Sequence, residues 1–358
     1  EFASLQGRII NRVAWAYDEP SSRSRRAKLY WHDLVVPITN TTLGSDESAY
    51  NRIWYHLEDK GYAYSGDIQP VRTVLNLGPQ KHWWGLMPAY IDQPATMGGK
   101  IVTVFNTNTA RGLHTHLAMI VLLDPETGAL QALMDGRYIT EARTGAVSAV
   151  SARHLARADA SRLAIIGTGV QARSHLEAFN EVRQLQDVRV WSPTRANRER
   201  FVDEMRSRAG VPLSAAGSAE EAVRDADLIV LATSAATPPV AASWIAEGSH
   251  IVSVGAPRRD HREIDPALLS RARVFVDSRA GALAESGDLV LGIAEGRFGP
   301  DHIAGELGEL VLGRVGGRQS ADQITIFKSL GMAVEDVATA DLVYRRAIEG
   351  GVGSRQVL

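Results

Sequence analysis

A glycine-bearing turn between an apolar strand and a helix most limits what this chain can fold into. The stretch RLAIIGTGVQARSHLEAF, residues 162–179, reads as a strand, a Gly-x-Gly-x-x-Ala turn and a helix. Gly167 permits a tight turn, Gly169 lets a pyrophosphate approach the backbone, and Ala172 allows close helix–strand packing. The free amide groups and partial positive charge at the start of the helix favour a phosphate. The stretch therefore predicts a dinucleotide site; the alternative is a glycine turn in an α/β protein that binds no nucleotide.

The sequence after this turn alternates apolar strands with helices, which is the context that the fingerprint requires. Short apolar strands separated by helices indicate a parallel sheet covered on both faces. We therefore predict an α/β fold with a Rossmann-type doubly wound parallel sheet. The helix that precedes the array is expected at 140–156, with Thr140 as its cap. Strands are expected at 162–167, 188–192, 227–233, 250–255 and 273–278, and the helices between them include 195–208 and 218–226.

The first third of the chain predicts a second, mainly antiparallel sheet with a helix beside it. Strands are expected at 71–77, 83–91, 100–107 and 116–124, and the sequence DPETG at 124–128 reads as a hairpin turn. Tyr50, Ile53, Trp54 and Leu57 recur at helical spacing and predict a helix there. A last helix, over 329–349, is expected to pack back on this sheet. Residues 1–30 read as an extension or a cloning remnant rather than a signal peptide.

Composition excludes several kinds of partner. The formal net charge is −2, with acids and bases interspersed, which argues against a nucleic-acid surface. The longest uncharged apolar run, LAMIVLL, is far too short to span a bilayer. The chain has no cysteine, so it has no disulfide and no thiolate ligand. A soluble cytoplasmic protein is the expectation.

The strand after the glycine turn bears on the choice of nucleotide. An NAD site usually has an acid near the end of this strand, where it holds the ribose hydroxyls. Here the strand ends in VWSPTRANR, which supplies Ser192, Thr194 and Arg195, with Arg198 one turn further. Hydroxyl and guanidinium donors can bind a 2′-phosphate, and no carboxylate is present to repel one. NADP is therefore favoured, and NAD is the alternative.

Three cations in otherwise apolar or small-residue segments are candidate binders of a substrate anion. Arg72 stands in QPVRTV, Lys100 is expected to start a strand, and Arg143 is expected in the first turn of the helix at 140–156. A buried cation needs a partner, and three that converge need an anion such as a carboxylate. Taken singly, each is more often a surface or salt-bridged residue.

Four long motifs resemble the ornithine cyclodeaminase/mu-crystallin family, in the right order and over the chain from about Gln69 to its end. They are GGKIVTVFNTNTARGL, LLDPETGALQALMDGRYITEARTGAVSAVSARHLA, IIGTGVQARSHLEAF and ITIFKSLGMAVEDVA. The resemblance implies a homodimer in which a Rossmann domain, residues 143–327, is inserted in a substrate-binding and dimerisation domain, residues 31–142 plus 328–358. It also implies that Arg72, Lys100 and Arg143 bind the substrate carboxylate.

Departures from the family pattern bear on the chemistry. Cyclodeaminases resemble one another in an acid before LMP, where this chain has Gly85, and in a later aspartate, where this chain has Pro257. Their C-terminal motif has aspartate where this chain has Lys328. Losing the first two acids removes the groups that would hold and deprotonate a diamine. The resemblance is therefore to the branch of ketimine reductases, imino-acid reductases and alanine dehydrogenases.

The resulting hypothesis is an oxidoreductase that adds hydride from NADPH or NADH to a C=N bond next to a carboxylate, in a small imino acid. Positioning by the three cations is the main catalytic device, and Lys100 is the group expected to tune protonation. A cyclodeaminase and a non-catalytic, crystallin-type NADPH-dependent binding protein are the alternatives. Expected cofactor contacts are Gly167, Gly169, Val170, Gln171 and Ala172 in the turn; Ser192, Thr194 and Arg195 after the next strand; and Thr233, Ser234, Val254, Gly255 and Lys328 at later strand ends.

Other polar features are expected to have ordinary roles. His114 and His116 share the spacing of one strand face, but no third ligand has an obvious spacing, so no metal site is predicted. His114 and Gly85 are candidate substrate contacts. Trp83 and Trp84 are expected to pack at an interface or pocket wall, and residues 258–263, RRDHRE, to form a solvated loop.

Overall fold

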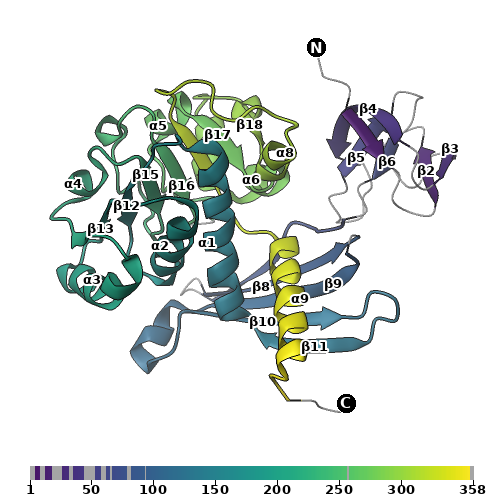
Figure 1. Cartoon of the computed structure of the whole chain (residues 1–358), viewed down its shortest axis with the longest axis horizontal. Coiled ribbons are helices and arrows are strands. Elements are labelled where there is room, and N and C mark those ends of the chain that lie inside the picture. The colour runs from purple at the N-terminus through teal and green to yellow at the C-terminus, as the bar shows by residue number, and fades with distance from the viewer. Residues whose placement is uncertain are drawn as a thin grey trace. The chain divides into compact units, whose positions relative to one another are not determined.

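The structure is a computed structural model that describes residues 5–8, 13–17, 26–31, 35–43, 53–57, 62–64, 67–78, 82–92, 94–255 and 258–354. The chain divides into two compact units, residues 1–139 with 332–358 and residues 140–331 (Figure 1). Both limits of the second unit lie within a few residues of the predicted 143–327. Residues 1–30, expected to be an extension, instead contain two strands and most of a third.

A six-stranded antiparallel sheet occupies the first part of the chain, in the order β1-β4-β5-β6-β2-β3. The expected helix that includes Ile53, Trp54 and Leu57 is wrong, because these residues form β5. Aromatic and β-branched side chains favour strands, and a spacing pattern this short cannot separate helix from strand. The strands are β1 (Leu5–Arg8), β2 (Val13–Tyr17), β3 (Arg26–Trp31), β4 (Val35–Leu43), β5 (Ile53–Leu57) and β6 (Tyr62–Tyr64).

A five-stranded antiparallel sheet, in the order β11-β10-β9-β8-β7, confirms the second predicted sheet. The hairpin turn predicted at 124–128 joins β10 to β11. The C-terminal helix α9 (Ala333–Gly350) packs on one face of this sheet (Figure 1) through Ala333, Val337 and Ala340. The strands are β7 (Thr73–Leu77), β8 (His82–Ile91), β9 (Thr96–Val104), β10 (His116–Leu123) and β11 (Leu130–Asp135), with a 3-10 turn, η1 (Asn106–Arg111), between the third and fourth.

The second unit is built on an eight-stranded sheet in which every pairing is parallel, in the order β14-β13-β12-β15-β16-β19-β17-β18. The chain leaves β12 for one side of the sheet and later returns to its other side at β15, so a topological switch point lies between these two strands. The strands are β12 (Arg162–Ile166), β13 (Asp187–Trp191), β14 (Leu213–Ala215), β15 (Leu228–Leu231), β16 (His250–Ser253), β17 (Arg273–Val276), β18 (Ile303–Glu306) and β19 (Thr325–Lys328).

Helices cover both faces of this sheet, which confirms the doubly wound architecture. One buried cluster joins α1, α2, α3 and α8 to alternate strand residues, and a second joins α4 to α7 to the others. The strands read as continuous apolar runs because neither of their faces meets water. The helices are α1 (Gly136–Leu155), α2 (Val170–Val182), α3 (Arg195–Ala209), α4 (Ala219–Val223), α5 (Pro266–Arg271), α6 (Arg279–Glu285), α7 (Gly287–Ala294) and α8 (Leu307–Val311), with 3-10 turns η2 (Ala242–Trp244) and η3 (Pro300–His302).

Helix α1 begins four residues before the predicted cap. Thr140 lies inside it, and Asp135 caps it instead, since its Oδ1 accepts a hydrogen bond of 2.8 Å from the amide of Arg137. Arg143 therefore lies at the end of the second turn of the helix rather than in the first.

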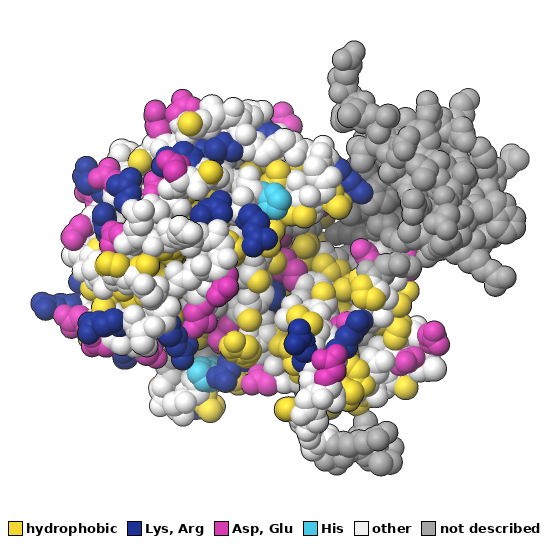
Figure 2. All heavy atoms as spheres, in the orientation of Figure 1, with side chains coloured by type: hydrophobic (Ala, Val, Ile, Leu, Met, Phe, Trp, Pro, Cys, Tyr) yellow, Lys and Arg dark blue, Asp and Glu magenta, His cyan; other side chains and the backbone are white. Residues whose placement is uncertain are grey.

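No described helix is long and apolar enough to cross a membrane. Lysine and arginine side chains are interspersed with aspartate and glutamate over the visible face of the second unit (Figure 2). This face therefore lacks the concentrated positive charge that a nucleic-acid surface needs.

Candidate active site

The glycine turn lies at the carboxyl end of β12, at the switch point of the sheet. Gly167 has a φ of 122°, and a Cβ atom there would lie 2.3 Å from the carbonyl oxygen of Ala232, which follows β15. Gly169 has an ordinary φ of −82°, and no atom lies within 4 Å of where its Cβ would be. The first glycine is thus required by the protein itself, whereas the second leaves open space before the N-terminus of α2.

A buried glutamate ties together the ends of β15 and β16 beside this turn. Glu263 Oε1 accepts hydrogen bonds from the amide and hydroxyl of Thr233, at 2.7 and 2.8 Å. Its Oε2 accepts from Ser253 Oγ and from the amide of Gly255, at 2.7 and 2.8 Å. Glu263 is fully buried, so the solvated loop expected at 258–263 is wrong at its last residue. Its carboxylate fixes the strand ends where a nicotinamide is expected.

Lys328, which is predicted to contact the cofactor, belongs to the same network. Its ammonium donates to Ser253 Oγ at 3.0 Å and to the carbonyl of Gly255 at 2.9 Å, and it pairs with Asp288 at 3.1 Å. Two hydrogen bonds and one ion pair thus hold this ammonium within the protein. Because the side chain is also fully buried, Lys328 supports Gly255 from inside the second unit.

The end of β13 presents the donors expected near the adenosine. Ser192 is buried, and its hydroxyl accepts a hydrogen bond of 3.3 Å from Thr168 Oγ1, next to Gly167. Arg198 donates to the carbonyl of Ser192 at 2.7 Å. Thr194 precedes α3 without capping it, and Arg195 is exposed and paired with Glu199.

In the first unit, Lys100 lies in the middle of β9 rather than at its start, on the face covered by α9. Its ammonium is 2.6 Å from the carboxylate of Asp336, and both side chains are almost completely buried. Sheet register pairs Lys100 with Met87 of β8 and with Ile120 of β10. Both neighbours are apolar. The charged group in contact with the Lys100 ammonium is the carboxylate of Asp336, which comes from α9.

Arg72 joins the same row of the sheet. Thr73 of β7 pairs with Leu86 of β8, so continuing the register by one residue puts Arg72 opposite Met87, two strands from Lys100. Two strand spacings are about 10 Å, a distance over which a long arginine side chain can approach a lysine. The register therefore brings two of the three predicted cations to one face of the sheet.

Gly85 lies on this face as well, because it is two residues before Met87 in β8. A Cβ atom there would lie 2.9 Å from the indole ring of Trp83 and 3.1 Å from Val102. The ring of Trp83 thus covers the position from which a cyclodeaminase-type acid would project. No side chain fits at Gly85 unless Trp83 moves.

Arg143, the third cation, is buried in the second unit against a turn that follows β19. A Cβ atom on Gly331 would lie 2.6 Å from one guanidinium nitrogen, and Gly331 has a φ of 83°. Asp277 holds this turn, since its Oδ2 accepts from the amides of Leu330 and Gly331 at 2.5 and 2.6 Å. The absence of a side chain at Gly331 leaves the space in which the guanidinium lies.

The remaining predicted contacts are placed as follows. Val170 and Gln171 begin α2, and buried Ala172 packs against the sheet. Ser234 is exposed after β15, and the amide of Val254 donates to the carbonyl of Leu231. His114 lies in the loop before β10, not on a strand face with His116, and Pro257 lies outside the described residues. The described residues contain no cluster of three or more side chains able to hold a metal.

Four buried acids of the site region were not predicted: Glu263, Asp277, Asp288 and Asp336. Asp277 had a usable signal, because it directly follows the apolar strand RVFV at the edge where parallel strands end. Asp336 lies one turn after Ala333 on the face that α9 buries, so its position in the helix could have suggested burial.

Two buried histidines connect α1 to its neighbours, His175 to α2 and His250 to the sheet of the second unit. His175 donates from Nδ1 to the carbonyl of Gln171 at 2.6 Å, and its Nε2 lies 2.8 Å from Ser148 Oγ. His250 of β16 lies 2.9 Å from Thr325 Oγ1 and 3.1 Å from Ser151 Oγ. Burial lowers the pKa of His175 to about 4, and burial with the nearby charge of Arg318 lowers the pKa of His250 to about 3.

These pKa values predict a loss of stability in mild acid. Unfolded histidine titrates near 6.5, so below that pH the unfolded chain binds two protons that the folded chain excludes. The free energy of unfolding is expected to fall by about 1.4 kcal/mol per pH unit for each histidine, or about 4 kcal/mol in total between pH 8 and pH 5. Urea unfolding at these pH values measures it.

Two variants test whether the buried histidines cause this loss of stability in acid. His175→Gln removes one titrating ring and is expected to halve the loss. His154→Gln, on the exposed last turn of α1, is expected to leave it unchanged. Equal pH dependence in the wild type and in His175→Gln would contradict the assignment.

The ornithine cyclodeaminase/mu-crystallin family model matches residues 55–351. Rat ketimine reductase mu-crystallin is 41% identical over 91% of this chain and 95% of its own length. The structure of Thermococcus litoralis Δ1-pyrroline-2-carboxylate reductase, in complex with NADH and L-proline, superposes with a TM-score of 0.80 and 40% identity, over 81% of this chain and 90% of that one. An archaeal alanine dehydrogenase dimer with bound NAD gives a TM-score of 0.77 and 34% identity, over 82% and 89%.

Proposed function

Because this chain belongs to the ornithine cyclodeaminase/mu-crystallin family, we propose that it is an NAD(P)H-dependent reductase of C=N bonds next to a carboxylate. The substrate is a small imino acid and the product is the corresponding amino acid. The similarity to a ketimine reductase and to a pyrroline-2-carboxylate reductase supports this reaction. The observation that favours the reductase over the lyase is the position of the Trp83 indole, which covers Gly85, where cyclodeaminases have an acid.

The glycine turn fits a dinucleotide. Open space in front of Gly169 and the free amides at the start of α2 suit a pyrophosphate, while Gly167 holds the bend. Val170 and Gln171 would contribute amides, and Thr233 and Gly255 would line the nicotinamide side. When bound, the reduced nicotinamide supplies the hydride that adds to the imine carbon.

Arg72, Lys100 and Arg143 are proposed to bind the substrate carboxylate and so to orient the imine carbon. Guanidinium and ammonium groups in apolar surroundings make strong charge-assisted hydrogen bonds to a carboxylate. A protonated imine is already electrophilic, so its carbon accepts the hydride while its nitrogen keeps the proton. The work of these residues is then to hold one reactant in place and to exclude alternative orientations. His114 stays a candidate substrate contact, since its loop precedes β10 of the same sheet.

NADP(H) is the proposed preference, with NAD(H) as the alternative. Ser192, Thr194, Arg195 and Arg198 lie at or just after the end of β13, where an NAD enzyme usually carries an acid. Between the end of β13 and Glu199 the chain has no carboxylate side chain. Glu199 itself is paired with Arg195. A 2′-phosphate would compete with Glu199 for that guanidinium.

A cyclodeaminase reaction is disfavoured because the site lacks a group for a distal amine at Gly85. A non-catalytic, NADPH-dependent binding protein is the other alternative, and turnover of an imine distinguishes it from the reductase.

We also propose a homodimer formed through the face of the five-stranded sheet opposite α9. Register puts Leu75, Trp84, Ile101, Met119 and Leu133 on that face, one from each strand. Leu75, Met119 and Leu133 are 52%, 41% and 58% exposed, and exposed large apolar side chains gathered on one sheet face are typical of a protein interface. The alanine dehydrogenase relative is a dimer. A cytoplasmic location stays a prediction from the cysteine-free sequence.

The decisive experiment follows absorbance at 340 nm with NADPH or NADH and a panel of cyclic and acyclic imino acids. We expect oxidation of NADPH with at least one α-imino carboxylate, and faster turnover than with NADH. A parallel incubation with NAD and ornithine or lysine tests the lyase. Ammonia release there, or tight NADPH binding with no turnover of any imine, would refute the proposal.

A further inference from the structure

The buried partner of Lys100 comes from the far end of the chain. Asp336 lies in the first turn of α9, and its carboxylate is 2.6 Å from the Lys100 ammonium, with side-chain exposures of 0% and 2%. Neither the motif around Lys100 nor the glycine turn predicts this contact.

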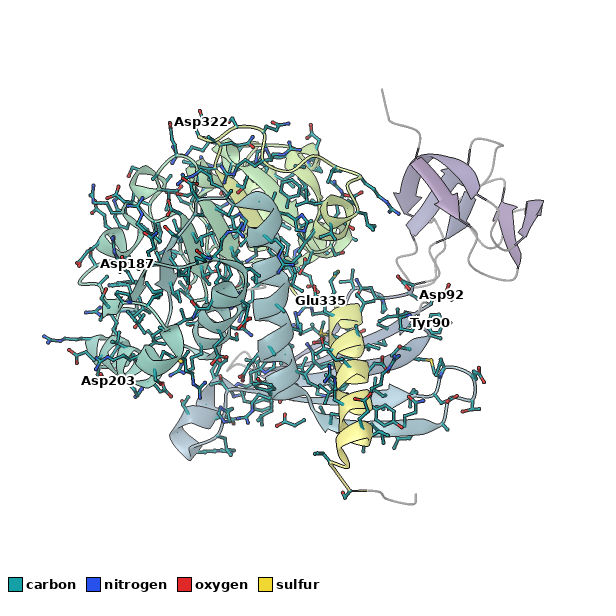
Figure 3. All side chains as sticks on the ribbon, viewed as in Figure 1. Tyr90, Asp92, Asp187, Asp203, Asp322 and Glu335 are labelled. Carbon is teal, nitrogen blue, oxygen red and sulfur yellow. The ribbon has the colours of Figure 1, made fainter. Side chains whose placement is uncertain are left out.

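The helix holds this carboxylate in a defined place. Ala333, Val337 and Ala340 are small or β-branched and pack on Met87 and the neighbouring strands, so α9 lies close to the sheet. The amide of Val334 donates to Gln69 Oε1 at 3.1 Å, and the side chain of Glu335 (Figure 3) caps the helix start. An acidic side chain in the first turn of a helix also interacts favourably with the helix dipole.

Burying the Lys100–Asp336 ion pair costs free energy of hydration. Two charges buried in an apolar surrounding lose more hydration than an apolar pair of the same volume, and such pairs are often replaced by apolar residues without loss of stability. Lys100 is flanked in its row by Met87 and Ile120, which shows that apolar side chains suit the position. Stability alone therefore gives no reason for a lysine and an aspartate here.

We propose that Asp336 is a positioning residue that fixes the Lys100 ammonium and keeps it charged, and so orients it toward the substrate carboxylate. This inference rests on the proposed function, which makes Lys100 a carboxylate ligand. The charged groups assigned to this face are Arg72, by register, and Asp336; Met87, Ile120 and Val102 carry no charge. With Asp336 removed, burial and the like charge of Arg72 would both favour the neutral amine.

Asp336→Asn tests the role by its pH dependence. The variant keeps the shape but not the charge, so Lys100 is expected to lose its proton at a lower pH. We expect kcat/KM to fall about 100-fold at pH 9 and much less at pH 6, whereas the wild type stays flat over this range. Asp341→Asn is the matched control, because it removes an acid paired with Arg345 on the same helix. It is expected to leave the pH profile unchanged.

Two further measurements separate positioning from folding. Asp336→Glu keeps the charge and is expected to keep the flat pH profile even if its rate is lower. In the background of Lys100→Met, Asp336→Asn is expected to have no further effect on kcat/KM, because the two residues act as one unit. A uniform loss at every pH, or full additivity of the two substitutions, would overturn the proposal.

A readout without substrate keeps this test independent of the proposed reaction. In protein labelled with ¹³C-lysine, the Cε signal of Lys100 reports its protonation, and the signal is assigned by its loss in Lys100→Met. The titration midpoint is expected to lie at least one pH unit lower in Asp336→Asn than in the wild type. An unchanged midpoint would overturn the Asp336 proposal, whereas a shifted midpoint in a protein that reduces no imine would leave it standing and reject the reductase.

Discussion

Replacing Lys100 by methionine is expected to lower kcat/KM for imine reduction by about 10²–10³-fold. Methionine fills the space but cannot donate, so the substrate carboxylate loses a charge-assisted hydrogen bond where no water can replace it. The substitution also leaves Asp336 buried without this cation, so the free energy of unfolding is expected to fall by about 3–5 kcal/mol. Steady-state kinetics and urea unfolding measure the two effects.

Arg137→Met serves as the control for this prediction. Arg137 lies in the first turn of α1, half-buried beside Asp135, and its loss removes one cation from the same unit. We expect it to leave kcat/KM within about twofold, because exposed ion pairs contribute little. A folded Lys100→Met protein with the wild-type rate would remove Lys100 from the site.

The second large effect is expected at Gly169, where an aspartate should abolish cofactor binding without harming the fold. Gly169 is the N-cap residue of α2, with extended backbone and open space in front of it. Aspartate is a favoured N-cap, so the free energy of unfolding should stay the same or rise slightly. Its carboxylate would occupy the phosphate site, and the repulsion is expected to raise the Kd for NADPH by about 10²–10³-fold.

Two variants separate charge, bulk and backbone in this prediction. Gly169→Asn has the same shape without the charge and is expected to weaken NADPH binding by only about tenfold. Gly167→Ala is expected to lower the free energy of unfolding by about 1–3 kcal/mol, because its φ of 122° and the nearby carbonyl of Ala232 leave no room for a methyl group. NADPH fluorescence titration and thermal unfolding measure these outcomes. Equal binding by Gly169→Asp and the wild type would place the pyrophosphate elsewhere.

The parallel sheet was predictable because its strands are short, apolar and separated by recognisable helices. The fold of residues 140–331 follows that prediction, apart from the short strands β14, β18 and β19, which sequence patterns this brief do not reveal. The place of β19 between β16 and β17 could not be predicted either, since it depends on how the chain returns across the sheet. At the N-terminus, the aromatic residues of β5 mimicked a helix because three or four apolar positions fit either period.

The candidate site was predictable only where a local motif carried it. The glycine turn, and the ends of the strands that follow it, could be read directly from residues 162–255. The surroundings of Lys100 could not, because its carboxylate partner is Asp336 and its apolar neighbours, Met87 and Ile120, come from two other strands. Lys328 is a second example: its place at a strand end predicts a cofactor contact, but no local motif reveals that Ser253, Gly255 and Asp288 surround its buried ammonium.

The division of the first unit between the two ends of the chain affects how the protein is made. During synthesis on the ribosome, residues 140–331 emerge complete and can fold while the five-stranded sheet still waits for its covering helix. Until α9 arrives, Lys100 and the apolar side chains around it face water. A nascent chain interrupted before Asp336 would therefore expose an apolar sheet face that chaperones and proteases can recognise.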